Sequence, residues 1–151
     1  MHDHLYDLVK HTPLQYSQRL SECFDAQIYL KREDLQEVRS YKIRGAYNFL
    51  LHLSAAERAH GVVTASAGNH AQGVAQAAAK LRIVATIFVP TTTPQQKLER
   101  IRYFGRNYVS IKVIGNDYDT CANSAQAYAQ RTKLVFVTPF DHPDIIHGQA
   151  S

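Results

Sequence analysis

A run of small and polar residues, Ser66-Ala67-Gly68-Asn69-His70-Ala71-Gln72-Gly73, follows a β-rich segment and opens a helical pattern. In an open α/β sheet, ligands bind outside the carboxyl ends of the strands. Small side chains there let backbone N–H groups approach an anion, and the helix N-terminus adds partial positive charge. Asn69 supplies both a hydrogen-bond donor and an acceptor. The run is a candidate site for an anionic ligand, although a turn with a helix cap gives the same pattern.

A second candidate is Lys42, at the expected start of a helix within the segment Lys31–Ala46. A nucleophilic lysine needs its pKa lowered from about 10.4, by burial or by a neighbouring cation. Lys42 lies one residue from an apolar stripe and within one turn of Tyr41 and Tyr47, which makes burial plausible. A solvated helix lysine is the alternative, and spacing alone does not decide between them.

Other kinds of site are not favoured. The glycines at 68 and 73 do not form the G-x-G-x-x-G pattern of dinucleotide-binding loops. The segment 141–147 gathers two aspartates and two histidines, but a turn at Pro143 explains it better than metal binding, and we expect no metal site. The basic residues are scattered apart from one cluster, which consists of Lys97, Arg100, Arg102 and Arg106. We interpret this cluster as a solvated helix face and therefore expect no nucleic-acid partner.

The composition is that of one globular domain. The chain has 151 residues, of which 45% are apolar and 20% charged, with a formal net charge of +4. Its apolar runs are far shorter than the roughly 18 residues of a membrane helix, and the first residues resemble no signal peptide. Two cysteines far apart in sequence indicate no disulfide framework. We therefore expect a cytoplasmic protein without membrane contact.

The elements that must position the candidate residues alternate between strand and helix from residue 61 onward. Strands are predicted near 62–65, 84–89, 108–114 and 134–138, with helices between them. One of these helices is expected at 94–104, with Thr93 as N-cap, Pro94 as its first residue and Gln96 completing a capping box. This order predicts an α/β fold with a small four-stranded parallel sheet flanked by helices. Before it, we expect a strand at 27–32, a helix whose apolar face runs from Ile43 to Leu53, and a second capping box opening at Ser54.

Together, the two candidate stretches resemble a known family. The run Glu33–Ala46 resembles the pyridoxal-phosphate attachment signature of the serine/threonine dehydratases, and Ser66–Gly73 resembles their cofactor and substrate loop. The segments 11–14, 89–97 and 139–143 also match the family in position. The resemblance covers nearly the whole chain and implies a pyridoxal-phosphate enzyme of fold type II, in which residues of about 1–53 belong to an N-terminal segment of the larger subdomain and about 54–148 form the smaller subdomain.

The resemblance also implies roles for single residues. Lys42 would bind pyridoxal 5'-phosphate covalently and later move the substrate's α-proton, with Tyr41 beside the cofactor ring and Asn69 on the ring hydroxyl. The substrate carboxylate would be held by Ser66, Ala67, Gly68 and His70. The implied reaction of the small amino-acid substrate is dehydration of L-threonine to 2-oxobutanoate and ammonia, in isoleucine biosynthesis, by a homo-oligomer.

Two departures limit that resemblance. In the family, the loop that grips the cofactor phosphate and the residue facing the pyridine nitrogen come after residue 151, so we expect this chain alone to be inactive. Arg82 stands where the family commonly has a helix-ending glycine. A non-catalytic relative that acts as a binding module remains an alternative, as does a serine dehydratase or racemase of the same family.

Overall fold

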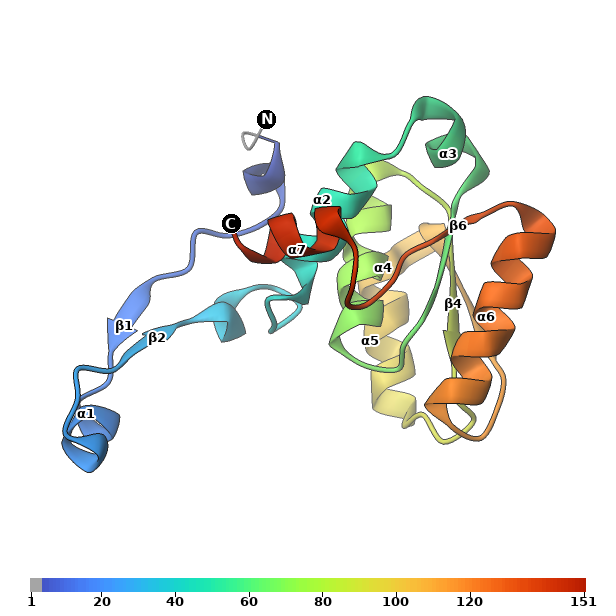
Figure 1. The fold of residues 1–151 in the computed structure, drawn as a ribbon. Coiled ribbons are helices and arrows are strands. Elements are labelled where there is room, and N and C mark those ends of the chain that lie inside the picture. The colour runs from blue at the N-terminus through green and yellow to red at the C-terminus, as the bar shows by residue number, and fades with distance from the viewer. Residues whose placement is uncertain (1–3) are drawn as a thin grey trace.

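The computed structural model describes residues 4–151 and contains a four-stranded parallel sheet (Figure 1). The strand order is β5-β4-β3-β6, and each pair of neighbours is parallel. The strands are β3 (Val62–Ala65), β4 (Ala85–Val89), β5 (Val109–Val113) and β6 (Val135–Phe136). The α/β fold and the parallel sheet predicted from the sequence are confirmed.

Helices cover both faces of this sheet (Figure 1). Helices α4 (Asn69–Leu81) and α5 (Gln95–Gly105) pack on one face, where they bury Ile87 and Val89 of β4. Helix α6 (Tyr118–Thr132) packs on the other face over Val63 and Phe88. Because successive strand side chains point to opposite faces, each inner strand contributes to the core on both sides of the sheet. This explains why β3 and β4 are buried at every position.

A third layer forms where α2 (Lys42–His52) packs against both α4 and α7 (Pro143–Gln149). Helices α2 and α7 approach closely at two glycines. A Cβ atom at Gly148 would lie 2.7 Å from the Cα atom of Gly45, and a Cβ at Gly45 would lie 2.9 Å from the carbonyl oxygen of Ile145. Only residues without a side chain permit this contact, which holds α7 against α2.

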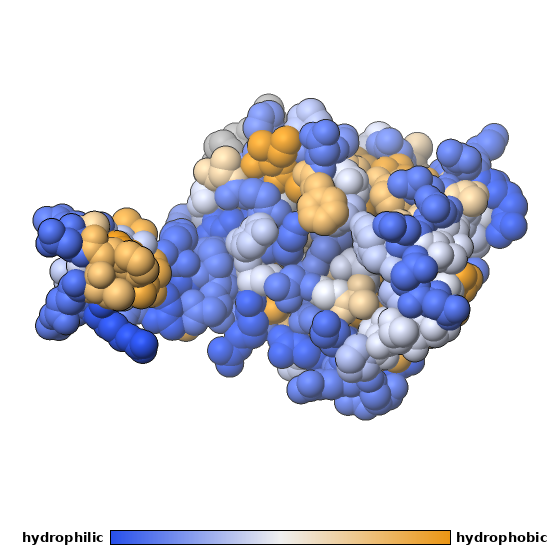
Figure 2. All heavy atoms as spheres, turned by 60° about the horizontal axis from the view of Figure 1, so that its bottom comes forward, coloured by the Kyte–Doolittle hydropathy of each residue, from blue (hydrophilic) through white to orange (hydrophobic). Residues whose placement is uncertain are grey.

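The N-terminal part extends away from the rest of the molecule as an arm (Figure 1). After the short 3-10 helix η1 (Leu5–Asp7), strand β1 (Leu14–Tyr16) pairs antiparallel with β2 (Tyr29–Lys31). Helix α1 (Gln18–Phe24) connects the two strands at the tip of the arm. Figure 2 shows apolar side chains gathered at the end of this arm. Its exposed apolar residues include Leu14, Tyr16, Phe24, Tyr29 and Leu30. The 3-10 helix η2 (Glu33–Leu35) leads back to α2.

The helix ends predicted from local sequence signals are confirmed at some positions and wrong at others. The capping box of Ser54 with Glu57 opens α3 (Ala55–His60) as predicted. The one expected at Thr93 does not form: α5 begins at Gln95 after Pro94, and the Thr93 hydroxyl donates instead to the Pro90 carbonyl at 2.7 Å. Arg82 ends α4 in the left-handed conformation, with φ of +58°, in place of the usual glycine.

Pro143, where we expected a turn, is instead the first residue of helix α7. Proline suits this position because its missing N–H would have no helical partner. The His142 ring nitrogen accepts a hydrogen bond from the Asp144 N–H at 3.2 Å, which caps the helix. The remaining short element is the 3-10 helix η3 (Arg106–Tyr108) before β5. Within residues 4–151, none of the helices combines the length and apolar character that a bilayer crossing demands.

Candidate active site

The loop Ser66–Gly68 connects the carboxyl end of β3 to the first residue of α4, Asn69. This confirms that Asn69 lies at a helix N-terminus just past the end of a parallel strand. The Ser66 hydroxyl accepts a hydrogen bond from the Gly68 N–H at 3.1 Å, which fixes the loop. Ser66, Ala67 and Gly68 are partly exposed and Asn69 is exposed. The first N–H groups of α4 therefore point from a partly open loop, where an anion can reach them.

Lys42 is the first residue of α2, and its amine is partly buried. The Nζ atom donates a hydrogen bond to the Pro139 carbonyl oxygen at 2.8 Å. Two aromatic rings lie nearby: the ring centre of Phe140 is 4.8 Å from Nζ and that of Tyr41 is 5.5 Å away. Burial lowers the pKa of the Lys42 amine, because the charged form loses hydration. The structure thus confirms the half-buried lysine that local spacing allowed.

Gly73 brings Lys42 and the loop to the same region. A Cβ atom at Gly73 would lie 3.1 Å from both the carbonyl carbon and the oxygen of Lys42, and 3.2 Å from the Ile43 nitrogen. The second turn of α4 therefore touches the start of α2 directly. The two stretches singled out in the sequence meet through this contact, which the sequence pattern did not show.

The His70 side chain points into the protein. It is 4% exposed, and its Nε2 lies 3.2 Å from the Val137 carbonyl oxygen, which also accepts from the Thr64 hydroxyl. The pKa of His70 is lowered to about 4, chiefly because burial disfavours the charged ring; the bond to Val137 partly offsets this effect and the Lys42 charge adds to it. The imidazole is neutral at pH 7, and Nε2–H is the donor to Val137. The backbone N–H of His70, in the first turn of α4, is the group that we consider for a bound ligand.

The segment after β6 completes the site. Val137 and Pro139 accept hydrogen bonds from His70 and Lys42 through their carbonyl oxygens. Sequence reasoning assigned no role to these residues, because a backbone carbonyl leaves no signal in side-chain type. The segment is held at its far end by α7, which packs on α2.

Arg44 anchors the same helix two residues after Lys42. Its guanidinium is 3% exposed and donates from Nε and Nη2 to the two carboxylate oxygens of Glu33, both at 2.8 Å. It also reaches the Lys10 carbonyl at 3.2 Å and the Ser151 hydroxyl at 3.1 Å. One side chain thus joins the N-terminal segment, η2, α2 and the end of α7. The side-chain hydrogen bonds that Arg44 donates to Glu33 raise the pKa of Arg44, so the group stays charged.

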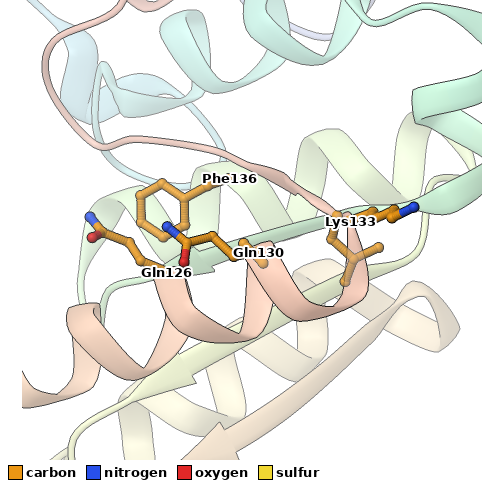
Figure 3. Close-up of a pocket in the computed structure, with 6 residues that line it drawn as sticks. Gln126, Gln130, Lys133 and Phe136 are labelled. Atoms are coloured by element: carbon orange, nitrogen blue, oxygen red, sulfur yellow. The ribbon is translucent and has the colours of Figure 1, made fainter.

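The cleft beside α6 carries less chemistry. Figure 3 shows a cleft between α6 and β6 whose labelled side chains are two glutamines, Lys133 and Phe136. Two amides and one lysine offer no pair of acid and base. Among residues 4–151, no group of three or more histidine, cysteine or carboxylate side chains is arranged to hold a metal ion. The Asp144 carboxylate lies 3.7 Å from ring nitrogens of His52 and His142, so it belongs to histidine contacts between α2 and α7.

Comparison with known proteins gives a consistent result. Residues 5–151 match the family described as pyridoxal-phosphate dependent enzyme. The chain is 50% identical over 150 residues to the biosynthetic L-threonine dehydratase IlvA of Lactococcus lactis, which spans 97% of this chain and 36% of that protein. It is 47% identical to the IlvA of Bacillus subtilis, over 99% of this chain and 36% of that protein. The chain therefore spans about a third of the length of these curated relatives.

Solved structures agree with the fold. The processed form of threonine deaminase isoform 2 from Solanum lycopersicum superposes with a TM-score of 0.89 at 42% identity, over 95% of this chain and 39% of that one. Maize serine racemase superposes with a TM-score of 0.88 at 28% identity, over 97% of this chain and 44% of that one.

Proposed function

The chain belongs to the pyridoxal-phosphate dependent enzyme family, and from this premise we propose that the protein deaminates L-threonine to 2-oxobutanoate and ammonia. The observation that carries the proposal is the Lys42 amine. It is the partly buried lysine whose pKa burial lowers, and it lies where the start of α2 meets the second turn of α4. The identity of 46–50% to biosynthetic threonine dehydratases supports threonine as the substrate.

The donor set around Lys42 fits pyridoxal phosphate. An aldehyde needs an amine that loses its proton readily, and Lys42 has that property. Tyr41 supplies an aromatic face 5.5 Å from the amine, and exposed Asn69 supplies an amide that can bond a ring hydroxyl. Bound there, the cofactor supplies an electron sink for the charge left when a bond at the substrate's α-carbon breaks.

Lys42 would act as the group that moves the α-proton. An amine can accept a proton only in its neutral form, and burial raises the neutral fraction near neutral pH. The Pro139 carbonyl accepts a hydrogen bond from this amine, and the lone pair of the neutral amine stays free to point elsewhere. The Pro139 carbonyl thus orients the Lys42 amine, and α2 fixes the position of the Lys42 backbone.

The start of α4 would bind the substrate carboxylate. The proposed contacts are the Ser66 hydroxyl, the backbone of Ala67 and Gly68, and the backbone N–H of His70. A Cβ atom at Gly68 would meet only the Ser66 hydroxyl oxygen, at 4.0 Å, so the space in front of this loop is open. Free N–H groups and partial positive charge at a helix N-terminus favour a carboxylate there.

The division into an N-terminal segment of about residues 1–53 and a smaller subdomain of about 54–148 stays a proposal. The arm supports it, because β1, α1 and β2 extend from the rest of the molecule. Helix α2, by contrast, packs on α4 and α7 and shares a core cluster with β3. The exposed apolar residues of the arm also support the proposal of a homo-oligomer, since such surface is commonly covered in an assembly. Action in the cytoplasm is proposed from the biosynthetic role of the relatives.

Serine racemisation is a second candidate, favoured by the close superposition on maize serine racemase. The lower identity of 28% ranks it behind threonine deamination. A non-catalytic binding module would keep the same fold and bind amino acids without turnover.

The test follows 2-oxobutanoate formation by the full-length protein with pyridoxal phosphate. Threonine turnover is expected, with a loss of about a thousandfold in Lys42→Ala while far-UV circular dichroism is unchanged. Lys97→Ala, an exposed lysine on α5, is the matched control and should retain turnover. Serine racemised without 2-oxobutanoate formation would favour the second candidate, and amino-acid binding without any turnover would favour a binding module.

A further inference from the structure

Phe140 is an exposed aromatic residue in the segment between β6 and α7. Its side chain is 67% exposed, and it belongs to none of the core clusters formed by the described residues. A phenylalanine with so much surface in water does not stabilise the fold by burial. The ring nevertheless has a defined neighbour, because its centre lies 4.8 Å from the Lys42 amine.

The backbone holds Phe140 in this place. The preceding residue, Pro139, has a fixed φ angle and accepts the Lys42 hydrogen bond through its carbonyl oxygen. On the other side, the chain enters α7, whose first residue is Pro143. Two prolines and one hydrogen bond therefore fix a short segment, and the Phe140 ring stands beside the amine that the proposed reaction uses.

Distance places this ring within reach of a substrate side chain. A base must come within about 3 Å of the group whose proton it takes. The β-carbon and the methyl group of threonine follow the α-carbon at about 1.5 Å per bond. The methyl group therefore lies within about 6 Å of Nζ, and apolar atoms touch at about 4 Å. A ring centred 4.8 Å from Nζ occupies this range.

The other groups near the amine are less suited to a methyl group. The Tyr41 ring is farther away, at 5.5 Å, and is proposed to lie beside the cofactor. The loop at the start of α4 offers a hydroxyl, an amide and backbone N–H groups, which favour polar atoms. Phe140 is the nearer of the two aromatic rings that contact Lys42.

We propose that Phe140 is a specificity-determining residue, whose ring contacts the substrate's β-substituent and favours threonine over serine. This inference rests on the proposed function, because it needs Lys42 to face the α-carbon of an amino acid. Threonine differs from serine by one methyl group, and the ring would remove that group from water. The contact is worth about fourfold, which corresponds to about 0.8 kcal/mol for one buried methylene.

The test compares Phe140→Ala and Phe140→Leu with the unmodified full-length protein, each loaded with pyridoxal phosphate. The first readout is the ratio of kcat/KM for threonine and serine. The second needs no turnover: dissociation constants of L-2-aminobutanoate and L-alanine, which differ by one methylene, are measured from cofactor absorbance. Phe24→Ala is the matched control, because Phe24 is also a phenylalanine and is 66% exposed on the arm.

In Phe140→Ala, the threonine preference should fall about fourfold, and 2-aminobutanoate should bind about fourfold more weakly while alanine binding is unchanged. Phe140→Leu keeps apolar bulk and should restore most of the preference, and Phe24→Ala should not change it. Equal effects on both members of each pair would overturn the role of Phe140 while leaving threonine deamination intact. An unmodified protein that neither binds nor turns over these amino acids would instead overturn the proposed function, and this inference with it.

Discussion

Replacing Glu33 by glutamine tests whether the buried ion pair with Arg44 stabilises the start of α2. The guanidinium is 3% exposed and its partner carboxylate 15% exposed, with two hydrogen bonds of 2.8 Å between them. In Glu33→Gln the guanidinium keeps its charge and its burial but loses the carboxylate. Removing one partner of a buried pair costs about 3–5 kcal/mol because it leaves an uncompensated charge. Since Glu33 keeps some solvent contact, we expect a loss of about 3 kcal/mol, the low end of that range.

The assay is urea unfolding at pH 7, followed by far-UV circular dichroism. The matched control is Asp34→Asn, which removes the carboxylate of the neighbouring exposed pair with Arg32, at 2.7 Å. Exposed pairs contribute less than about 1 kcal/mol, so this variant should unfold almost like the unmodified protein. If Glu33→Gln lowers the free energy of unfolding by no more than Asp34→Asn does, the reasoning about the buried pair is refuted.

The same pair predicts a pH dependence. Burial by itself would raise the pKa of Glu33, but hydrogen bonds from Arg44 and Thr12 and the Arg44 charge together hold it below its ordinary value of 4.5. A carboxyl whose pKa is lowered in the folded state contributes stability above its unfolded pKa, and this contribution is lost as pH falls through the folded value. The difference in stability between the unmodified protein and Glu33→Gln should therefore be full at pH 6 and shrink below pH 4.5.

Three further outcomes are expected. Gly148→Ala should lower the free energy of unfolding by about 1–3 kcal/mol, since its Cβ would lie 2.6 Å from the Arg44 carbonyl oxygen; unchanged urea unfolding would disprove the close contact of α2 with α7. The free energy of unfolding of the unmodified protein should fall by about 3 kcal/mol as pH falls from 6.5 toward 4, because His70 binds a proton in the unfolded chain but stays neutral when it is buried in the folded protein. In His70→Gln, which keeps a donor for Val137, the free energy of unfolding should fall less over this pH range. The same pH dependence of stability in both proteins would contradict the pKa assigned to His70. Residues 1–151 alone should form no 2-oxobutanoate from threonine, because they span about a third of the length of the curated relatives and would hold the cofactor and substrate poorly. Misplacement of the reacting groups alone costs about a hundredfold in rate. Steady formation of 2-oxobutanoate would count against this expectation.

Much of the sheet could be predicted because its strands are buried runs of β-branched and apolar residues between helical patterns. The position of Asn69 followed from the same alternation, since a strand that runs into a helix leaves a loop at the carboxyl edge. Helix α7 could not be predicted in this way. Seven residues are too short to show a helical period, and this helix depends on packing against Gly45.

The site shows the same division between local and distant effects. The types of Lys42 and Asn69 and their places at helix starts are local properties and could be read from the sequence. Their proximity depends on Gly73, which lets α4 touch the start of α2, and no local pattern indicates that contact. The inward direction of His70 was missed for a related reason: its partner is a backbone carbonyl 67 residues later in the chain.

The most direct test of the central claim is chemical identification of the lysine that binds the cofactor. The full-length protein is loaded with pyridoxal phosphate, reduced with borohydride, digested and analysed by mass spectrometry. The account predicts the pyridoxyl label on Lys42 alone, because burial lowers the pKa of its amine. A label on Lys10, Lys31 or Lys97 instead, or full labelling retained in Lys42→Ala, would contradict the assignment of the site.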